Sequence, residues 1–414
     1  MISSKPARLA IIVSHPIQYH APLWVVLNEH PELAIRVFYT WDNRDITGFH
    51  DHGFQKQIRW DVPLLEGYPW EFVPNVARHP GTHHFRGLIN PDLVQRVLAW
   101  QPDVVMVNGY MHQSHLLAMW SLAACKMPLL FRGDSHLLSP RGGIKKLLRA
   151  WVLRILFRRC QGFLYCGTLN RDYFRSFGVP PERLHFCPHV VDNTRFAADS
   201  IVRNQEASAW RLSLGIPPDC RVLLFAGKLQ EKKQPMLLLD AFLAADIANT
   251  VLLFVGDGEL RDALSIRAQS VRNRVYFLPF QNQSGMPLVY RLGDLFVLPS
   301  SHDETWGLGV NEAMCCGVPV LLSDQVGCGP DLVEPDVTGW IFPARNKTAL
   351  VERLRLAMQP QVDLKKMGAA AQQKIQSWNL LQARDGIIQA IQAIPIHALS
   401  QRLSNNLLIS KKNE

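Results

Sequence analysis

SSHDETWGLGVNEAMCCGVPVLLS, residues 300–323, is the stretch that decides the fold of this chain. The apolar run at 295–298 just before it predicts a buried strand. A glycine-containing turn and a short helix over about 309–316 follow, and Gly317 is placed to end that helix. Residues 318–322 then predict the next strand. The stretch is therefore the strand–turn–helix–strand unit of an α/β domain.

Two carboxylates lie within this unit. Glu304 is in the turn and Glu312 in the helix, with seven residues between them. Gly307, Leu308 and Gly309 lie at the helix entrance, where unpaired N–H groups and the helix dipole favour an anion. The pattern predicts an anion site with acidic groups beside it.

This spacing, followed by Ala-Met and then by Gly-Val-Pro-Val at 317–320, resembles the donor-site signature of retaining glycosyltransferases of the GT-B fold, glycosyltransferase family 4 type. The resemblance implies an α/β fold with two Rossmann-like, doubly wound parallel-sheet domains that face each other across a cleft. It also implies a nucleotide diphosphate sugar as donor and an acceptor hydroxyl. Taken alone, the block is also compatible with an ordinary α/β domain.

A second block strengthens the resemblance. A buried strand is predicted at 221–226. After it, Gly227-Lys228-Leu229, with Lys233 five residues after Lys228, resembles the Gly-Arg/Lys-Leu segment of that family and its second lysine. The resemblance implies that both lysines neutralise the donor diphosphate and stabilise it as a leaving group. The alternative is a solvated lysine-rich loop.

The remaining donor-site roles also come from the resemblance. It implies that Glu312 holds the ribose hydroxyls, that Glu304 holds the donor sugar, and that backbone groups near Phe280 read the base. The Gly256-Asp257-Gly258 turn is a poor dinucleotide fingerprint because Arg261 occupies the third glycine position. No Asp-x-Asp motif occurs in the sequence, so we expect neither a metal site nor a cofactor.

The first half of the chain alternates predicted strands and helices, which indicates a parallel sheet with ligands at the carboxyl ends of its strands. His15 and Gln18 follow the first strand, and Asp134 and His136 follow the strand at 128–131. The resemblance implies that His136 faces the reacting sugar, and we assign His15, Gln18 and Asp134 to the acceptor. The alternative is that these side chains only shape turns or pack.

An aromatic-rich insertion at 42–80 lacks a helical period and contains Trp60 and Trp70. Sugars stack their apolar faces on such rings, so the insertion is a candidate acceptor-recognition loop. The other interpretation is a small core beneath a long loop.

Charge is unevenly distributed. The net charge is +9, and residues 1–200 hold 22 Lys/Arg against 15 Asp/Glu. The segment 141–159 alone carries seven basic residues and an apolar stripe that includes Trp151. It is either a domain helix with a solvated basic side or a helix that docks on an anionic membrane. We expect no nucleic-acid partner.

The cellular location of the protein is predicted from two sequence features, membrane spans and a signal peptide. No apolar run approaches the ~18–20 residues needed to span a bilayer, and the N-terminal apolar run is too short for a signal peptide. We expect a cytoplasmic protein, and a membrane-docking helix at 141–159 would make it peripheral on the inner face of the membrane. A sugar or lipid-linked saccharide acceptor, in cell-surface polysaccharide or glycolipid synthesis, is consistent with this.

The length of 414 residues predicts two domains. We expect an N-terminal acceptor domain over 1–198, a linker over 199–209 and a nucleotide-sugar domain over 210–379. Residues 380–414 then form a helix that crosses back to the first domain, followed by a tail. Two other functions remain open: a GT-B epimerase or phosphorylase, and a non-catalytic sugar- or lipid-binding scaffold.

Overall fold

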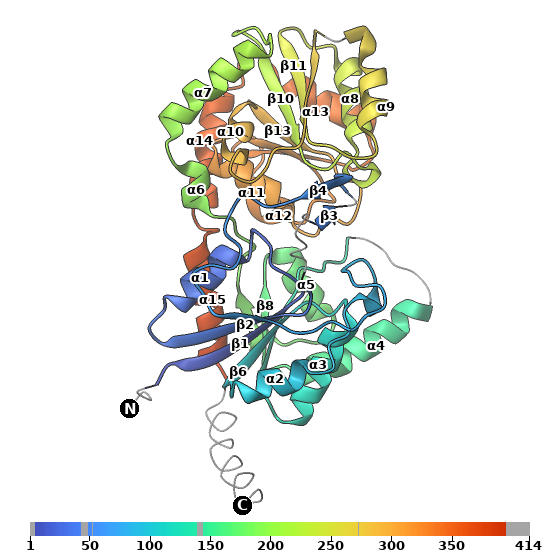
Figure 1. Cartoon of the computed structure of the whole chain (residues 1–414). Helices are drawn as coiled ribbons and strands as arrows, with labels where there is room; N and C mark the ends of the chain where they lie inside the picture. The colour runs from blue at the N-terminus through green and yellow to red at the C-terminus, as the bar shows by residue number, and fades with distance from the viewer. Residues whose placement is uncertain (1–4, 43–48, 52, 139–143, 272, 395–414) are drawn as a thin grey trace, which may run out of the picture. The chain divides into compact units, whose positions relative to one another are not determined.

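The computed structural model describes residues 5–42, 49–51, 53–138, 144–271 and 273–394. The chain divides into two compact units. Unit 1 comprises Met1–Asp45, Pro63–Pro188 and Leu380–Glu414, and unit 2 comprises Ile46–Val62 and His189–Asn379. Each unit is built around one parallel sheet, whose elements are labelled in Figure 1.

Unit 1 contains a seven-stranded sheet in the order β5-β2-β1-β6-β7-β8-β9, with every neighbouring pair parallel. Its core is aromatic, with Phe131, Phe157, Phe163 and Phe174 fully or almost fully buried. The strands are β1 (Ala7–Val13), β2 (Leu33–Tyr39), β5 (Trp70–Phe72), β6 (Val104–Asn108), β7 (Leu129–Arg132), β8 (Gly162–Tyr165) and β9 (Leu184–Phe186). The helices are α1 (Ala21–Asn28), α2 (Leu93–Ala99), α3 (Gln113–Ala124), α4 (Ile144–Arg158), α5 (Thr168–Ser176) and α15 (Leu380–Gln392).

Unit 2 contains a six-stranded parallel sheet in the order β12-β11-β10-β13-β14-β15. The strands are mostly apolar because helices cover the sheet, as in other all-parallel sheets. They are β10 (Arg221–Ala226), β11 (Thr250–Val255), β12 (Val275–Leu278), β13 (Leu295–Leu298), β14 (Val320–Ser323) and β15 (Gly339–Phe342). The helices are α6 (Asn193–Ala197), α7 (Ser200–Ser213), α8 (Pro235–Ala245), α9 (Arg261–Arg267), α10 (Met286–Arg291), α11 (Leu308–Cys315), α12 (Gly329–Leu332), α13 (Lys347–Ala357) and α14 (Leu364–Ile375).

The expected linker at 199–209 differs from what the structure shows. The chain enters unit 2 at His189, and residues 200–213 form helix α7. Only Ala207 of this helix is fully buried, which explains why its sequence is polar and looks irregular. Arg211 fixes the helix by donating to the Leu292 carbonyl at 2.9 Å and by pairing with Asp294 at 3.1 Å. The chain returns to unit 1 at Leu380, where α15 begins.

The aromatic-rich insertion is shared between the two units. Residues 49–51 form β3 (Phe49–Asp51), which pairs antiparallel with β4 (Lys56–Ile58). Figure 1 shows this pair in blue among the elements of unit 2, to which it belongs. Trp70, in contrast, lies in the edge strand of the unit 1 sheet and donates to the Leu65 carbonyl at 2.7 Å.

Helix α4 buries only part of the predicted apolar stripe, including Leu156. Leu153, Leu156 and Phe157 are buried, whereas Trp151 is 62% exposed. The side chains of 141–148, which carry three of the seven basic residues, lie outside the described residues. None of the described helices is both long enough and apolar enough to cross a membrane.

Candidate functional site

The order of strands in unit 2 reverses between β10 and β13. The chain runs outward from β10 through β11 to β12, and then outward on the other side from β13 to β15. Loops that follow the two central strands meet at such a switch point, where α/β sheets bind ligands. The loop after β10 carries Lys228 and Lys233, and the loop after β13 carries Glu304.

Lys233 and Glu304 contact each other at this point. The Lys233 Nζ forms an ion pair with Glu304 Oε2, and the Ser300 hydroxyl donates to the same oxygen at 3.0 Å. Burial by itself raises the pKa of Glu304, but the charge of Lys233 and the two hydrogen bonds outweigh it and leave the pKa lowered. Glu304 is therefore an ionised carboxylate held against a cation at neutral pH.

The backbone around Glu304 is fixed by the loop after β14. The N–H of Gly327 donates to the Glu304 carbonyl at 3.0 Å, and the N–H of Cys328 donates to the Trp306 carbonyl at 3.0 Å. A Cβ at position 327 would lie 1.9 Å from the Thr305 carbonyl oxygen, so only glycine allows this approach. The two loops therefore act as one rigid wall of the site.

Helix α11 begins beside this wall. Gly307 is its N-cap residue, with a φ of +95° that favours glycine, and Leu308 and Gly309 open its first turn. On the buried side of the helix, Glu312 is 2% exposed and its Oε2 accepts from the Tyr290 hydroxyl at 2.6 Å. The expected helix entrance is confirmed in position, and Glu312 is held by a partner that the sequence did not indicate.

Lys228 is bound by a residue far away in the sequence. Its Nζ lies 2.9 Å from the carboxylate of Asp51, whose Oδ1 also accepts from the backbone N–H groups of Gly53 at 2.8 Å and Phe54 at 3.0 Å. Burial raises the pKa of Asp51, but Lys228 and the two N–H groups outweigh it and lower the pKa overall. Asp51 is therefore an ionised partner of Lys228.

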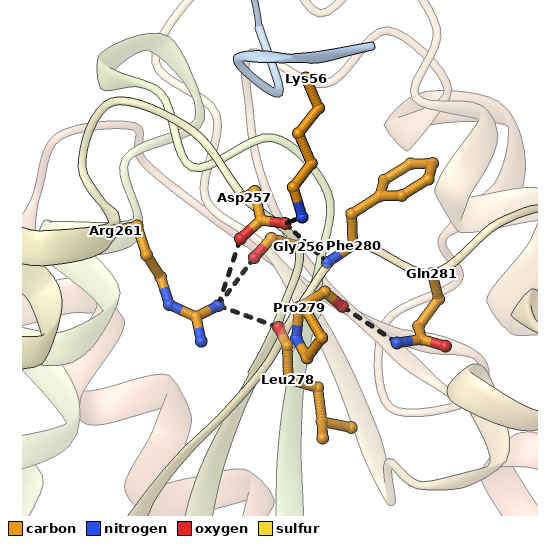
Figure 2. A network of polar contacts seen from close by, with 8 residues as sticks. All are labelled: Lys56, Gly256, Asp257, Arg261, Leu278, Pro279, Phe280 and Gln281. Carbon is orange, nitrogen blue, oxygen red and sulfur yellow. Dashed lines mark hydrogen bonds and ion pairs between the residues drawn. The ribbon is translucent and has the colours of Figure 1, made fainter. Parts of the chain in front are cut away.

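Phe280 is positioned by a second network around Asp257 (Figure 2). Asp257 Oδ2 accepts from the Phe280 N–H at 2.9 Å and from Lys56 Nζ at 2.6 Å. Arg261 closes the network by donating to the carbonyls of Gly256 and Leu278, both at 2.9 Å. The Gly256–Gly258 turn and the start of the loop after β12 are thus fixed to each other.

In unit 1, the loops after β1, β6 and β7 lie at one edge of the sheet, because these three strands are parallel neighbours. His15, after β1, contacts the Ser14 hydroxyl at 3.0 Å and the Trp41 ring edge-on. Burial, with His112 and His83 adding to it, lowers the pKa of His15 to about 4. Gln18 is half-buried in the same turn.

Asp134 and His136 follow β7, and a polar network holds their loop. Asn170 Nδ2 donates to the Ser135 carbonyl at 2.8 Å. The Tyr110 hydroxyl lies 3.2 Å from the Ser135 hydroxyl and accepts from Arg149 at 2.6 Å. His136 itself accepts from the Leu138 N–H at 3.2 Å. Arg149 of α4 therefore contributes to the loop rather than to a free basic surface.

The structure thus brings several predicted residues together within each unit. Lys233 and Glu304 are in contact in unit 2, whereas Lys228 is bound to Asp51 and Glu312 to Tyr290. In unit 1, the His15–Gln18 turn and the Asp134–His136 loop share a sheet edge, with β6 between their strands. No local sequence signal marks Asp51, Asp257 or Tyr290 as site residues, because each lies near its partner only in the folded chain. Among the described residues, no group of three or more His, Cys, Asp or Glu could hold a metal ion.

Comparisons with known proteins match both halves of the chain. Residues 206–374 match the family model for glycosyl transferases group 1, and residues 59–189 match that for a glycosyl transferase 4-like domain. A D-inositol 3-phosphate glycosyltransferase of Mycobacterium tuberculosis is 31% identical over 77% of this chain and 70% of that protein. One from Rhodococcus opacus is 29% identical over 80% of this chain and 78% of that protein.

Solved structures share the fold. The Anabaena protein HepE in complex with UDP superposes with a TM-score of 0.71 at 20% identity, covering 94% of this chain and 100% of that one. WaaG, a glycosyltransferase involved in lipopolysaccharide biosynthesis, superposes with a TM-score of 0.63 over 91% and 97% of the two chains. This chain has two parallel-sheet units, and its sequence matches and these structural neighbours agree with them. Together they show that the chain belongs to the group 1 glycosyl transferases and is a glycosyltransferase of the GT-B fold.

Proposed function

We propose that the protein transfers a sugar from a nucleotide diphosphate sugar to an acceptor hydroxyl, with retention of configuration and without a metal ion. The observation that carries this is the Lys233–Glu304 pair at the switch point of the unit 2 sheet. A cation beside an ionised carboxylate provides one group for a phosphate and one for sugar hydroxyls. The Anabaena neighbour has also been solved with UDP-glucose, which is a donor of this class.

In this proposal, positive charge at the switch point balances the departing diphosphate. Lys228 and Lys233 lie on the same loop after β10, and the start of α11 at Gly307–Leu308–Gly309 adds N–H groups and the positive end of the helix dipole. Charges that are already in place stabilise a developing anion without reorganisation. We assign no nucleophile to the retaining step.

The donor's two sugars would be held by the two carboxylates. Glu304 is ionised and held by Lys233 and Ser300, so it can accept hydrogen bonds from the hydroxyls of the transferred sugar. Glu312 would accept from the ribose hydroxyls, and the hydrogen bond from Tyr290 to its Oε2 holds the carboxylate in place. Backbone groups at Phe280 would contact the base, and the Asp257 network holds that backbone in place.

The acceptor would bind to unit 1. The low pKa of His15, about 4, keeps its ring neutral at pH 7, so it can hydrogen-bond a hydroxyl instead of attracting an anion. Gln18 and Asp134 provide further polar groups at the same sheet edge, and His136 would contact the reacting sugar. The network around Ser135 supports this role because it fixes the loop that carries both residues.

We further propose a lipid-linked saccharide acceptor, presented at an anionic membrane surface that the 141–159 segment contacts. Trp151 is exposed on α4, and Arg154 and Arg158 are exposed on the same helix. An exposed tryptophan with basic neighbours suits the interface of an anionic bilayer. Such a protein would act in cell-surface polysaccharide or glycolipid synthesis, as a peripheral protein on the inner face of the membrane.

The donor is tested by thermal shift with UDP, GDP and ADP and with their glucose, galactose and mannose conjugates. One nucleotide series should raise the melting temperature in a concentration-dependent way, because a ligand of the folded state stabilises it by mass action. The anomeric configuration of the product, read by NMR, tests retention. No stabilisation by any nucleotide would contradict the proposed donor class.

Membrane contact is tested by cosedimentation with vesicles that contain phosphatidylglycerol. Trp151→Ala should weaken binding, and raised salt should weaken it further. Ile266→Ala is the matched control, since Ile266 is 67% exposed but lies in unit 2. Equal binding by wild type and both variants would contradict a role for α4.

A further inference from the structure

Residues 49–61 come from the first half of the chain but are bound to unit 2 at several points. Beyond the Asp51–Lys228 and Lys56–Asp257 pairs, Asn282 Nδ2 donates to the Arg59 carbonyl at 2.7 Å. The Ser284 N–H donates to Asp61 Oδ1 at 3.1 Å. We call residues 49–51 and 53–61 the strap; the partners named here lie in the loops after β10, β11 and β12.

Aromatic side chains add to these polar contacts. The Phe54 ring packs edge-on against Phe280, with centroids 4.7 Å apart, and Trp60 lies 6.5 Å from the same ring. Lys228 Nζ also lies 5.1 Å from the centroid of Phe54, within range of a cation–π interaction. The strap therefore contacts both the lysine and the phenylalanine that are proposed to bind the donor nucleotide.

The strap fits this place closely. A Cβ at Gly53 would lie 2.5 Å from Lys228 Cδ. A Cβ at Gly258 would lie 2.7 Å from the Leu229 carbonyl oxygen and 3.0 Å from that of Gly53. Gly258 thus allows the strap backbone to approach the turn after β11, whereas the contact at Gly53 is with the flexible end of the Lys228 side chain.

The ion pair between Asp51 and Lys228 matters for the binding of a nucleotide. Asp51 is the carboxylate that the structure places on Lys228, and its own turn at Gly53 and Phe54 holds it in that orientation. A nucleoside diphosphate brings negative charge to the same ammonium group. Two anions that share one cation repel each other, so the ligand gains full access to Lys228 only when Asp51 leaves it.

We propose that Asp51 is an internal competitor of the donor diphosphate and that the strap releases Lys228 when a nucleotide binds. This rests on the proposed function, since it takes Lys228 as a diphosphate-binding residue. Asp51 then sets the affinity for the donor without contacting it. Lys56 and Asp61, which bind Asp257 and Ser284, keep the strap beside the site after Asp51 has left.

The test is titration calorimetry with UDP, and with GDP and ADP in parallel, on the full chain. Asp51→Asn should bind nucleotide about fivefold more tightly than wild type, the scale expected when a part-exposed ion pair no longer has to break. Asp240→Asn is the matched control, because it removes a carboxylate of unit 2 that pairs with Arg267. It should leave the affinity unchanged. Equal or weaker binding by Asp51→Asn would overturn the proposal.

Hydrogen exchange on the wild type gives a second measurement that needs no variant. Peptides that cover residues 53–58 should exchange faster with saturating nucleotide than without it, because Asp51 no longer closes the turn. Slower or unchanged exchange would count against the strap. Absence of nucleotide binding by wild type and by Asp51→Asn alike would instead contradict the proposed function, so the two failures are distinguishable.

Discussion

The Tyr290 hydroxyl donates a hydrogen bond of 2.6 Å to Glu312 Oε2, and both side chains are at most 2% exposed. The tyrosine belongs to α10 and the carboxylate to α11. A buried carboxylate needs such donors, because an ionised group without them is strongly destabilised. This relationship ties the proposed ribose-binding residue to the interior of unit 2.

Tyr290→Phe removes this donor while it keeps the ring. We expect the free energy of unfolding to fall by about 1–3 kcal/mol, since the buried carboxylate loses this hydrogen-bond donor. Urea denaturation measures the change. In a Glu312→Gln background the same substitution should cost less, because the neutral amide is less costly to leave unpaired. Equal costs in both backgrounds would show that the hydrogen bond contributes little.

Lys233→Met leaves the buried Glu304 without its cation. We expect the free energy of unfolding to fall by about 1–3 kcal/mol and sugar transfer to fall by about a hundredfold or more. Steady-state kinetics and urea denaturation measure the two effects. Lys232→Met removes a neighbouring charge that forms no ion pair with Glu304 and should have a smaller effect on both. The assignment would be wrong if the two variants behaved alike.

Gly327→Ala should distort the wall of the site. The new Cβ would lie 1.9 Å from the Thr305 carbonyl oxygen, so the Glu304 loop has to shift. We expect loss of transfer activity and a lower melting temperature. Gly285→Ala is a suitable control, because its nearest neighbour would be 3.6 Å away and its φ is −81°. It should retain activity and change stability by less than about 1 kcal/mol.

Stability should depend on pH through His115. Burial, with His112 adding to it, lowers the pKa of this ring to about 4. Its Nδ1 faces the carbonyls of Asn108 and Gly109, so Nδ1 carries the proton and Nε2 accepts from Thr40. The unfolded chain therefore binds a proton at a higher pH than the folded one. The contribution to stability is complete above about pH 6.5 and is lost as the pH falls toward 4.

His115→Asn should reduce this pH dependence. The slope of unfolding free energy against pH between about 4 and 6.5 should decrease by up to about 1.4 kcal/mol per pH unit, the value for one proton. Urea denaturation at a series of pH values measures it, with the exposed His79→Asn as control. An unchanged slope in the His115 variant would show that its ring is not the group that titrates.

Local sequence determined the two parallel sheets and the loop positions of the site. Period and breakers predicted strands at 295–298 and 221–226 and a helix over about 309–316, and the structure has elements there, with the helix at Leu308–Cys315. These signals depend on neighbours in the chain, namely apolar runs, a glycine-containing turn and a glycine that ends the helix. The charged residues at the strand ends followed from the same local pattern, because parallel strands place their carboxyl ends at one edge.

Only the tertiary structure decided which charged side chains form ion pairs. Asp51 pairs with Lys228, which is 177 residues away in the sequence, and Lys56 pairs with Asp257, which is 201 residues away. The helix at 200–213 and the buried face of α4 were also set by packing partners that no local period reveals. Ion pairs and buried faces depend on distances in space, and loop closure brings together residues whose spacing in the sequence carries no signal. For that reason the sequence indicated Lys228 and Lys233 as site residues but gave no sign of Asp51, the carboxylate that pairs with Lys228.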